Sequence, residues 1–312
     1  MSNLIQLKDA VDLLKKGRVV VTPSETVYGL CGNAFDDDAV KVIFHTKRRP
    51  SSNPLIVHYA TQAMLKQDVI VTPSVQRLMN AFCPGPLTFV LNKKQGSRLA
   101  SKVSAGLETV AVRLPSHPVF QELLRACGFP LAAPSANVAG TLSPTHPSHV
   151  WRTLKDVPVV AGEVPVCGLE STVVDLRGET PLLLRPGALA VEALEAVLQQ
   201  PFVLPQTAPT KVFHSPGLFP RHYAPSKPLR LEATSVASDE GLLAFGPCPL
   251  KGAHTTVNLS EKGDLSEAAQ RFFELMHHLD QSSCQRIAVM PIPFKGAGVA
   301  LNDRLKRAAT SG

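Results

Sequence analysis

Residues 19–58 constrain the fold of this chain more than any other stretch. The β-branched residues 19–21 lead into the polar loop Ser24-Glu25-Thr26, as a buried strand does when it runs into a functional loop. The acidic residues 36–38 predict the start of a helix, and residues 55–57 predict a second buried strand with His58 at its carboxyl end. The stretch therefore predicts strand, loop, helix and strand, with polar groups at the turns.

The rest of the chain repeats this alternation in two parts. Apolar runs of strand length alternate with segments of helical periodicity up to residue 200, which predicts an α/β domain with a mixed sheet. Residues 201–228 contain seven prolines, which leave few amides for a helix or a central strand, so we expect an extended linker. Residues 229–312 begin a second alternation, typical of a small open α/β domain.

Charge and cysteine usage limit the function and the compartment. The net charge of +7 suits a polyanionic ligand, but ATP, tRNA and an acidic protein would all be attracted. The six cysteines form no Cys-x-x-Cys pair and no zinc spacing, so we expect reduced core residues. The amphipathic, charged N-terminus is unlike a signal peptide, and no apolar run has bilayer length. A cytoplasmic protein without a membrane segment is expected.

Several common catalytic motifs are missing. The chain has no P-loop, no Gly-x-Gly-x-x-Gly after a strand, no Gly-x-Ser-x-Gly and no His-Glu-x-x-His. His146 and His149 have a loose metal-ligand spacing, but they lie in a Pro-rich loop and at a helix start, so no metal ligand is assigned. Hydrolase, P-loop and zinc-protease chemistry are therefore disfavoured.

Cations and hydroxyls collect at the predicted strand ends and turns instead. They are Lys47 with Arg49, Arg113, Ser135 with Asn137, Ser171, and Arg185. Arginine binds carboxylate and phosphate through two parallel hydrogen bonds, and lysine acts as a point charge. Such a site would catalyse by holding reactants together and neutralising charge on a transferring phosphoryl group.

An ordered series of motifs carries a resemblance to a known family. These motifs are PSETVYGL at residues 23–30, KRRPSSNPLIVH at 47–58, PGPLT at 84–88, TVAVR at 109–113, APSAN at 133–137 and ESTVVD at 170–175. Together they resemble the YrdC family. With HYAP at 222–225 and GVALNDR at 298–304, the chain is similar over almost its whole length to the two-domain threonylcarbamoyl-AMP synthases.

The resemblance implies a fold and a reaction. It implies a YrdC-like twisted mixed sheet with helices in residues 1–200, a Pro-rich linker acting as a lid at 201–228, and a Rossmann-like domain at 229–312. The implied enzyme is a nucleotidyltransferase that joins L-threonine, bicarbonate and ATP into L-threonylcarbamoyladenylate and releases pyrophosphate. ATP would bring Mg²⁺, and no permanently bound cofactor is expected. The product would pass to a transferase complex that modifies the adenosine beside a tRNA anticodon, and weak binding of tRNA or other RNA is compatible with this role.

The resemblance also implies roles for individual residues. The expected threonine contacts are Thr26, His58, Arg113, the backbone at Ala133, and Ser171. The expected ATP contacts are Arg49, Asn53, Thr109, Ser135, Asn137, Ser143, Arg185 and Tyr223. Lys47 and Arg49 are the expected catalytic cations.

Two alternatives belong to other classes. A non-catalytic RNA-binding protein could use the same basic concave surface through phosphate contacts. Against it, only 5% of the residues are aromatic, which leaves little for base stacking. A carbamoyl-transfer accessory domain of hydrogenase maturation or of an antibiotic pathway is disfavoured because the additional domains expected of it are absent. Pyrophosphate release that requires both threonine and bicarbonate separates these readings.

Overall fold

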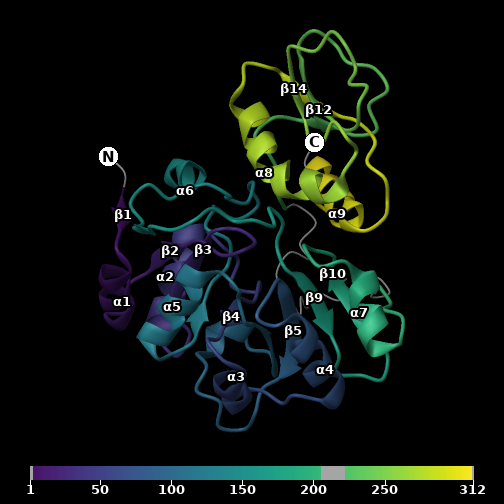
Figure 1. Cartoon of the computed structure of the whole chain (residues 1–312). Coiled ribbons are helices and arrows are strands. Elements are labelled where there is room, and N and C mark those ends of the chain that lie inside the picture. Colours follow the sequence, from purple (N-terminus) through teal and green to yellow (C-terminus); the bar gives the residue numbers. More distant parts are fainter. Residues whose placement is uncertain (1–2, 205–221, 311–312) are drawn as a thin grey trace.

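The computed structural model describes residues 3–204 and 222–310. Figure 1 shows two α/β bodies, a larger one built from the N-terminal two thirds of the chain and a smaller C-terminal one. Each body has its own sheet with helices packed on it. The predicted α/β class, with a mixed sheet followed by a second open sheet, is confirmed.

The helices and strands have the following bounds. The helices are α1 (Leu7–Lys15), α2 (Asp37–Lys47), α3 (Gln62–Asp68), α4 (Pro73–Phe82), the 3₁₀ turn η1 (Ser101–Ser104), α5 (Pro118–Cys127), α6 (Pro147–Thr153), α7 (Val191–Leu198), α8 (Leu265–Gln281) and α9 (Ala297–Ala309). The strands are β1 (Leu4–Ile5), β2 (Val20–Thr22), β3 (Gly29–Asn33), β4 (Ile56–His58), β5 (Leu87–Asn92), β6 (Thr109–Arg113), β7 (Leu131–Ala132), β8 (Val159–Val160), β9 (Thr172–Asp175), β10 (Leu182–Arg185), β11 (Leu229–Arg230), β12 (Glu240–Ala244), β13 (Thr255–Asn258) and β14 (Arg286–Val289).

The two sheets differ in strand direction. Within the described residues the large sheet has the order β1-β8-β2-β3-β7-β4-β6-β5-β9-β10, and parallel and antiparallel pairs alternate irregularly along it. The small sheet has the order β11-β14-β12-β13 and is parallel throughout. Parallel pairing requires crossover connections, and α8 supplies the one between β13 and β14.

The sequence prediction for residues 19–58 missed one strand. Residues 29–33, expected within the loop, form β3, which pairs antiparallel with β2 and with β7. Gly29 and Gly32 give this segment a low strand propensity. A Cβ on Gly32 would lie 3.0 Å from Ile43 Cδ1, a tight approach, whereas one on Gly29 would make an ordinary contact with Ala133 at 3.4 Å. Tertiary contacts therefore override the local preference.

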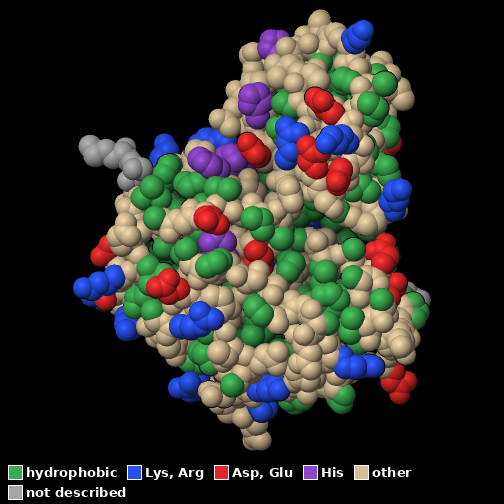
Figure 2. Space-filling view, viewed as in Figure 1, with side chains coloured by type: hydrophobic (Ala, Val, Ile, Leu, Met, Phe, Trp, Pro, Cys, Tyr) green, Lys and Arg blue, Asp and Glu red, His purple; other side chains and the backbone are tan. Residues whose placement is uncertain are grey.

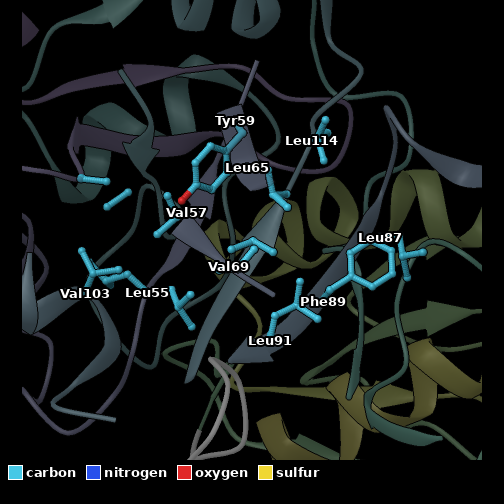
Figure 3. Close-up of a cluster of buried hydrophobic side chains, with 14 of the residues drawn as sticks. Leu55, Val57, Tyr59, Leu65, Val69, Leu87, Phe89, Leu91, Val103 and Leu114 are labelled. Atoms are coloured by element: carbon cyan, nitrogen blue, oxygen red, sulfur yellow. The ribbon is translucent and has the colours of Figure 1, made fainter. Parts of the chain in front are cut away.

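Side-chain alternation along the central strands separates the core from the opposite face of the sheet. Leu55, Val57 and Tyr59 around β4 point into the main hydrophobic core together with Leu87, Phe89 and Leu91 of β5 (Figure 3). Successive side chains of a strand point to opposite faces. Ile56 and His58 therefore lie on the other face, as do Ala111 and Arg113 of β6.

The end of α2 turns two cations inward. Asp36 caps the helix start by accepting hydrogen bonds from the amides of Asp38 and Ala39. At the other end Arg48 has a left-handed conformation with φ 51°, a geometry that commonly terminates helices. The side chains of Lys47 and Arg49 on either side of it are both buried. The predicted helix with its basic terminus is therefore present, and its two flanking cations face the interior.

A shared apolar cluster joins the two bodies. Val27, Leu142, Leu169 and Tyr223 pack with the core of the C-terminal domain, which includes Phe273 of α8. The predicted lid at 201–228 falls mostly on residues 205–221, which lie outside the described residues. The junction that is described has an apolar interior, and such burial contributes about 1.5–3 kcal/mol for each large side chain.

A pair of stacked histidines crosses the same junction. The rings of His149 on α6 and His277 on α8 lie 3.8 Å apart. His277 Nε2 donates to the Ser143 carbonyl, and Nδ1 accepts from Arg152, so protonation would place a charge against a guanidinium. Burial is the main cause that lowers the pKa of His149 to about 3 and that of His277 to about 4. Both rings are therefore neutral at pH 7.

Two of the sequence predictions concern membrane segments and cysteines. No helix among the described residues is long and apolar enough to cross a membrane. All six cysteines are free, but the prediction that they are core residues is wrong for Cys248, which is exposed, and for the half-buried Cys83 and Cys167. Cys248 follows β12 in a Gly-Pro-Cys-Pro turn, and such turns lie on the surface.

The histidine stack predicts a pH-dependent stability. Because the folded pKa of His277 lies below the ordinary value of about 6.5, the unfolded chain binds the proton more readily. The contribution of His277 to the free energy of unfolding is therefore present above pH 6.5 and is lost as the pH falls toward 4. At pH 5 this single site should cost about 2 kcal/mol relative to pH 7.5. Urea denaturation at the two pH values should show that His277→Gln loses about 2 kcal/mol less on acidification than the wild type.

The neighbouring exposed His278 provides the control. His278→Gln should show the full wild-type loss. Equal acid sensitivity in both variants would contradict a neutral, buried His277 at the junction.

Candidate functional site

The ends of several strands meet around one buried cavity. It is lined by Thr26, Val27, Arg49, Ile56, His58, Arg113, Ala133, Pro134, Ser135, Glu170, Ser171, Arg185, His222 and Tyr223. These residues come from the loop after β2, the end of α2, β4, β6, the loop after β7, the segment before β9, the end of β10 and the end of the linker. Elements far apart in the sequence thus contribute to one site.

Most of the residues predicted from the sequence lie in this cavity. Nine of them line it, namely Thr26, Arg49, His58, Arg113, Ala133, Ser135, Ser171, Arg185 and Tyr223. Five others do not line it, namely Lys47, Asn53, Thr109, Asn137 and Ser143. The structure therefore brings together the cations and hydroxyls that the sequence places at separate turns.

Arg113 is held from three sides at the end of β6. Its Nε donates to the Gly85 carbonyl at 3.2 Å, and its Nη1 donates to Thr26 Oγ1 at 3.0 Å. Its Nη2 lies 2.7 Å from Glu25 Oε1, and both side chains are 5% exposed. Burial alone would raise the pKa of Glu25, but Arg113 and nearby amides outweigh it and hold that pKa below its ordinary value. The guanidinium is thus fixed in orientation.

The loop after β2 fixes Thr26. Ser24 Oγ accepts from the amides of Thr26 and Val27, each at 3.2 Å, and donates to the Val27 carbonyl at 2.6 Å. It also lies 2.9 Å from Thr26 Oγ1. The Ser24 hydroxyl therefore closes a compact turn that presents the Thr26 hydroxyl to the cavity.

His58 is an uncharged group in the cavity wall. Its ring stacks on Phe120 with centroids 5.0 Å apart. Burial, reinforced by Arg113, lowers the pKa of His58 to about 3. Its Nδ1 has no hydrogen-bond partner among the described residues. A neutral imidazole with a free nitrogen can hydrogen-bond a polar ligand without repelling a cationic one.

Arg49 is bound by carbonyl and amide oxygens beyond the end of α2. Its Nε donates to the Asn53 carbonyl at 3.0 Å, and Nη2 donates to Asn53 Oδ1 at 2.5 Å and to the Pro54 carbonyl at 2.7 Å. Burial lowers the pKa of Arg49 to about 9, which leaves the guanidinium charged at pH 7. Asn53 therefore acts as a support for Arg49.

Lys47 supports the loop that carries Ser135. Its Nζ donates to the carbonyls of Ser135 and Asn137 at 2.5 and 2.6 Å. Burial and the charge of Arg49 lower the pKa of Lys47, whereas the two carbonyl acceptors favour its charged form. Lys47 thus lies one layer behind the cavity wall.

Arg185 and Ser171 form a second fixed group in the cavity wall. Arg185 Nη2 donates to the Ser171 carbonyl at 2.8 Å and to its Oγ at 3.2 Å. Ser171 Oγ lies 2.8 Å from Thr88 Oγ1. Gly187 allows the chain after Arg185 to pass close to the backbone of Ser171 and Thr172, where a Cβ would overlap it. The cation and the hydroxyl therefore reach the cavity together.

The remaining predicted residues do not line the cavity. Ser143 Oγ donates to Glu170 Oε1 at 2.5 Å. Thr109 lies at the start of β6, at the opposite end of that strand from Arg113. Asn53 lines a neighbouring cleft of about 560 Å³ between the two bodies, and that cleft shares His222 with the cavity.

Several buried polar atoms of the site lack partners. Tyr223 Oη, His222 Nδ1 and His58 Nδ1 find no hydrogen-bond partner within the described part of the chain, and all three side chains line the cavity. Buried polar groups are normally satisfied, so unsatisfied ones clustered in one place require an explanation. A polar ligand in this region would satisfy them.

The charge of the site is also unbalanced. Glu25 pairs with Arg113, and Glu170 pairs with Arg304 of α9. Lys47, Arg49 and Arg185 are buried, and none of them forms an ion pair with a carboxylate of the described residues. A buried charge without a counterion is costly. The arrangement therefore favours a ligand with several negative charges.

The outer surface shows no comparable concentration of positive charge on the face in Figure 2. Lys and Arg side chains are scattered there among Asp and Glu, including those above the junction of the two bodies. No group of three or more His, Cys, Asp or Glu in the described residues could hold a metal ion. The unpaired cations of the site are buried, and the face in Figure 2 shows no equivalent group.

Sequence reasoning gave no role to Glu25, Glu170 or Arg304. All three lie inside motifs that it quoted, and each carboxylate directly precedes a predicted threonine contact. The available signal was a charged residue beside the end of a predicted buried strand, which indicates a buried ion pair. It did not say which opposite charge would pair with it, because both partners are remote in sequence.

Two family models match the chain. A family model described as telomere recombination, for Sua5, YciO and YrdC proteins, matches residues 12–187. A second model, for the C-terminal domain of threonylcarbamoyl-AMP synthase, matches residues 189–310. The threonylcarbamoyl-AMP synthase of Bacillus subtilis (strain 168) is 36% identical over 324 residues, which cover 97% of this chain and 93% of that protein.

A solved structure agrees over both bodies. The crystal structure of P. abyssi Sua5 complexed with L-threonine matches with a TM-score of 0.89 and 32% identity, covering 97% of this chain and 94% of that one. The fold and the site therefore place the chain in the Sua5/YciO/YrdC class of α/β proteins. Because the similarity continues through the second body, the chain belongs to the two-domain threonylcarbamoyl-AMP synthase family. The resemblance drawn from the motifs is confirmed.

The Glu25–Arg113 pair predicts a large effect of a small change. Glu25→Gln removes one carboxylate charge and leaves the buried guanidinium uncompensated, which typically costs about 3–5 kcal/mol. Urea denaturation at pH 7 should show a loss of this size. Glu122→Gln on α5, where the carboxylate is exposed, should change stability by less than about 0.5 kcal/mol. Equal stability of the two variants would contradict a buried ion pair.

Proposed function

We propose that the protein is an L-threonylcarbamoyladenylate synthase. It joins L-threonine, bicarbonate or CO₂, and ATP into threonylcarbamoyl-AMP and pyrophosphate, and is thus a nucleotidyltransferase. The observation that carries this proposal is the set of buried cations without carboxylate partners, beside a separate Arg113 with fixed orientation. The unpaired cations suit a triphosphate, and the guanidinium of Arg113 suits a single carboxylate.

The threonine side is centred on Arg113. Its guanidinium binds the amino acid carboxylate, with the hydroxyls of Thr26 and Ser171 and the backbone at Ala133 completing the contacts. His58 is neutral, so it can hydrogen-bond the amine or hydroxyl of the substrate through its free Nδ1. This neutrality matters because the threonine amine must be uncharged in order to react.

The nucleotide side is formed by Arg49, Arg185, Ser135 and Tyr223. Arg49 and Arg185 bind phosphate oxygens, and the unsatisfied Tyr223 hydroxyl offers a further hydrogen bond. Asn53, Thr109, Asn137 and Ser143 are also proposed nucleotide contacts or supports for them. The adjoining cleft of about 560 Å³, which includes Asn53, gives room for part of the nucleotide.

The reaction then follows in two steps. The threonine amine attacks the carbon of CO₂ and forms a C–N bond, and loss of one N–H proton gives a carbamate. When bicarbonate supplies the carbon, a C–O bond of bicarbonate breaks and water leaves. A carbamate oxygen attacks the α-phosphorus of ATP, and the bond to the bridging oxygen breaks as pyrophosphate leaves. Lys47, Arg49 and Arg185 stabilise the negative charge that develops, and the site holds the reactants in line.

Magnesium enters with ATP as part of the substrate. Mg²⁺ usually keeps several waters and is bound through substrate phosphates rather than by an all-protein cage. The two carboxylates of the cavity region are already held by arginines, which agrees with this mode of entry. The product is then available to a threonylcarbamoyl transferase complex acting on tRNA.

Two charge-conserving variants test the division of the site. Arg113→Lys keeps the charge but loses the forked geometry, so the KM for threonine should rise about tenfold or more while the KM for ATP changes little. Arg49→Lys should show the reverse, because Arg49 hydrogen-bonds to Asn53 and Pro54 and to none of the proposed threonine contacts. The measurement is pyrophosphate release as a function of each substrate at fixed concentrations of the others.

The wild type serves as the test of the activity itself. Its pyrophosphate release should require ATP, threonine and bicarbonate together. Release that ignores threonine or bicarbonate would refute the proposed reaction, and two variants with the same kinetic defect would refute the division into two sides.

A further inference from the structure

None of residues 298–304, the C-terminal motif, lines the cavity. Packing within the C-terminal domain explains the first part of this motif. Gly298 lies against the Pro293 carbonyl, where a Cβ would overlap it. Asn302 Nδ2 donates to the carbonyls of Ile292 at 3.0 Å and Gly298 at 2.9 Å. These contacts fix the first turns of α9 against the preceding loop.

The last residue of the motif reaches the other body. The Arg304 side chain is 0% exposed. Its Nε donates to Glu170 Oε2 at 3.0 Å, and its Nη1 donates to the Pro186 carbonyl at 2.8 Å and to Asp303 Oδ2 at 2.7 Å. Its guanidinium carbon lies 5.0 Å from the centre of the Tyr223 ring, within the range of a cation–π contact.

Each of these partners outside α9 either belongs to the nucleotide side of the cavity or adjoins a residue of it. Glu170 lines the cavity, and its other oxygen accepts a hydrogen bond from Ser143. Pro186 directly follows Arg185, and Tyr223 lines the cavity itself. One guanidinium from the C-terminal domain thus contacts one proposed nucleotide contact, Tyr223, and the neighbours of two others, Ser143 and Arg185.

A second contact between the bodies lies in the same region. Gly168 has φ +69°, and a Cβ there would overlap the carbonyls of Ala269 and Gln270 on α8. The next residue, Leu169, is buried in the apolar cluster of the C-terminal domain. The segment leading to Glu170 and Ser171 is therefore pressed against the C-terminal domain.

We propose that Arg304 is a positioning residue through which the C-terminal domain assembles the nucleotide side of the site. This inference rests on the proposed function and gives the C-terminal domain a task in it. Arg304 holds Glu170, and so Ser143, in place, and it fixes the Tyr223 ring over the cavity. The competing explanation is that Arg304 only neutralises the buried charge of Glu170.

Kinetics of Arg304→Met test the proposal. The KM for ATP should rise, with kcat/KM for ATP falling about tenfold to a hundredfold, because small displacements of binding groups have effects of this size. The KM for threonine should rise much less than the KM for ATP, because Arg304 contacts neither Arg113 nor its partners, and Ser171 beside Glu170 is the one proposed threonine contact next to its network. Lys306→Gln removes a positive charge from the exposed face of the same helix, and both constants should stay within about twofold. Unchanged ATP kinetics in Arg304→Met would overturn the proposal.

A double variant separates positioning from charge balance. Arg304→Met/Glu170→Gln removes both charges, so its melting temperature should recover toward the wild-type value relative to Arg304→Met. A KM for ATP that stays raised supports positioning. Recovery of the KM together with stability would overturn it, because charge balance would then be sufficient.

Direct binding separates this inference from the proposed reaction. Calorimetric titration of ATP into the wild type and Arg304→Met should show weaker binding by the variant, whatever reaction follows. Equal affinities would overturn the role of Arg304. A wild type that binds ATP but releases no threonine-dependent pyrophosphate would instead refute the proposed function.

Discussion

The alternation of side chains along β4, β5, β6 and β9 is the constraint on which the rest of the molecule depends. One face of these strands is apolar and forms the main core, and this burial fixes the register of the sheet. The opposite face must then present His58 of β4 and its cross-strand partner Arg113 of β6. A shift of one residue in any of these strands would move its site residues into the core. The stability of the core and the composition of the site are therefore set by the same pairing.

Burying a group of cations requires compensation, and the protein provides it unequally. Arg113 has the carboxylate of Glu25 and therefore keeps a fixed orientation without a ligand. Arg49 and Arg185 are held by neutral oxygens alone, so their charge is oriented but not cancelled. The cost of this arrangement is offset by the large core and by packing against the second domain. The result is a site whose attraction for a polyanion is built into its resting structure.

The C-terminal domain is part of this arrangement. It buries Leu169 and Tyr223, and it contributes Arg304 to a network that ends at the cavity wall. The Gly168 contact makes the junction too close for even one additional carbon atom. These contacts explain why residues near the C-terminus belong to the same pattern of motifs as the site, although they do not line it.

The sequence by itself determined the α/β class, nearly all of the long helices, the strands carrying Arg113 and Arg185, and the types of residue that a phosphate and a carboxylate require. These features depend on local periodicity and on chemistry that one residue can express alone. It did not determine strand β3, because two glycines weaken its local signal and only the pairing with β2 and β7 makes this segment a strand. Nor did it pair Glu25 with Arg113 or Glu170 with Arg304, because an ion pair is a property of two positions, and only the folded chain brings positions 134 residues apart to within 3.0 Å.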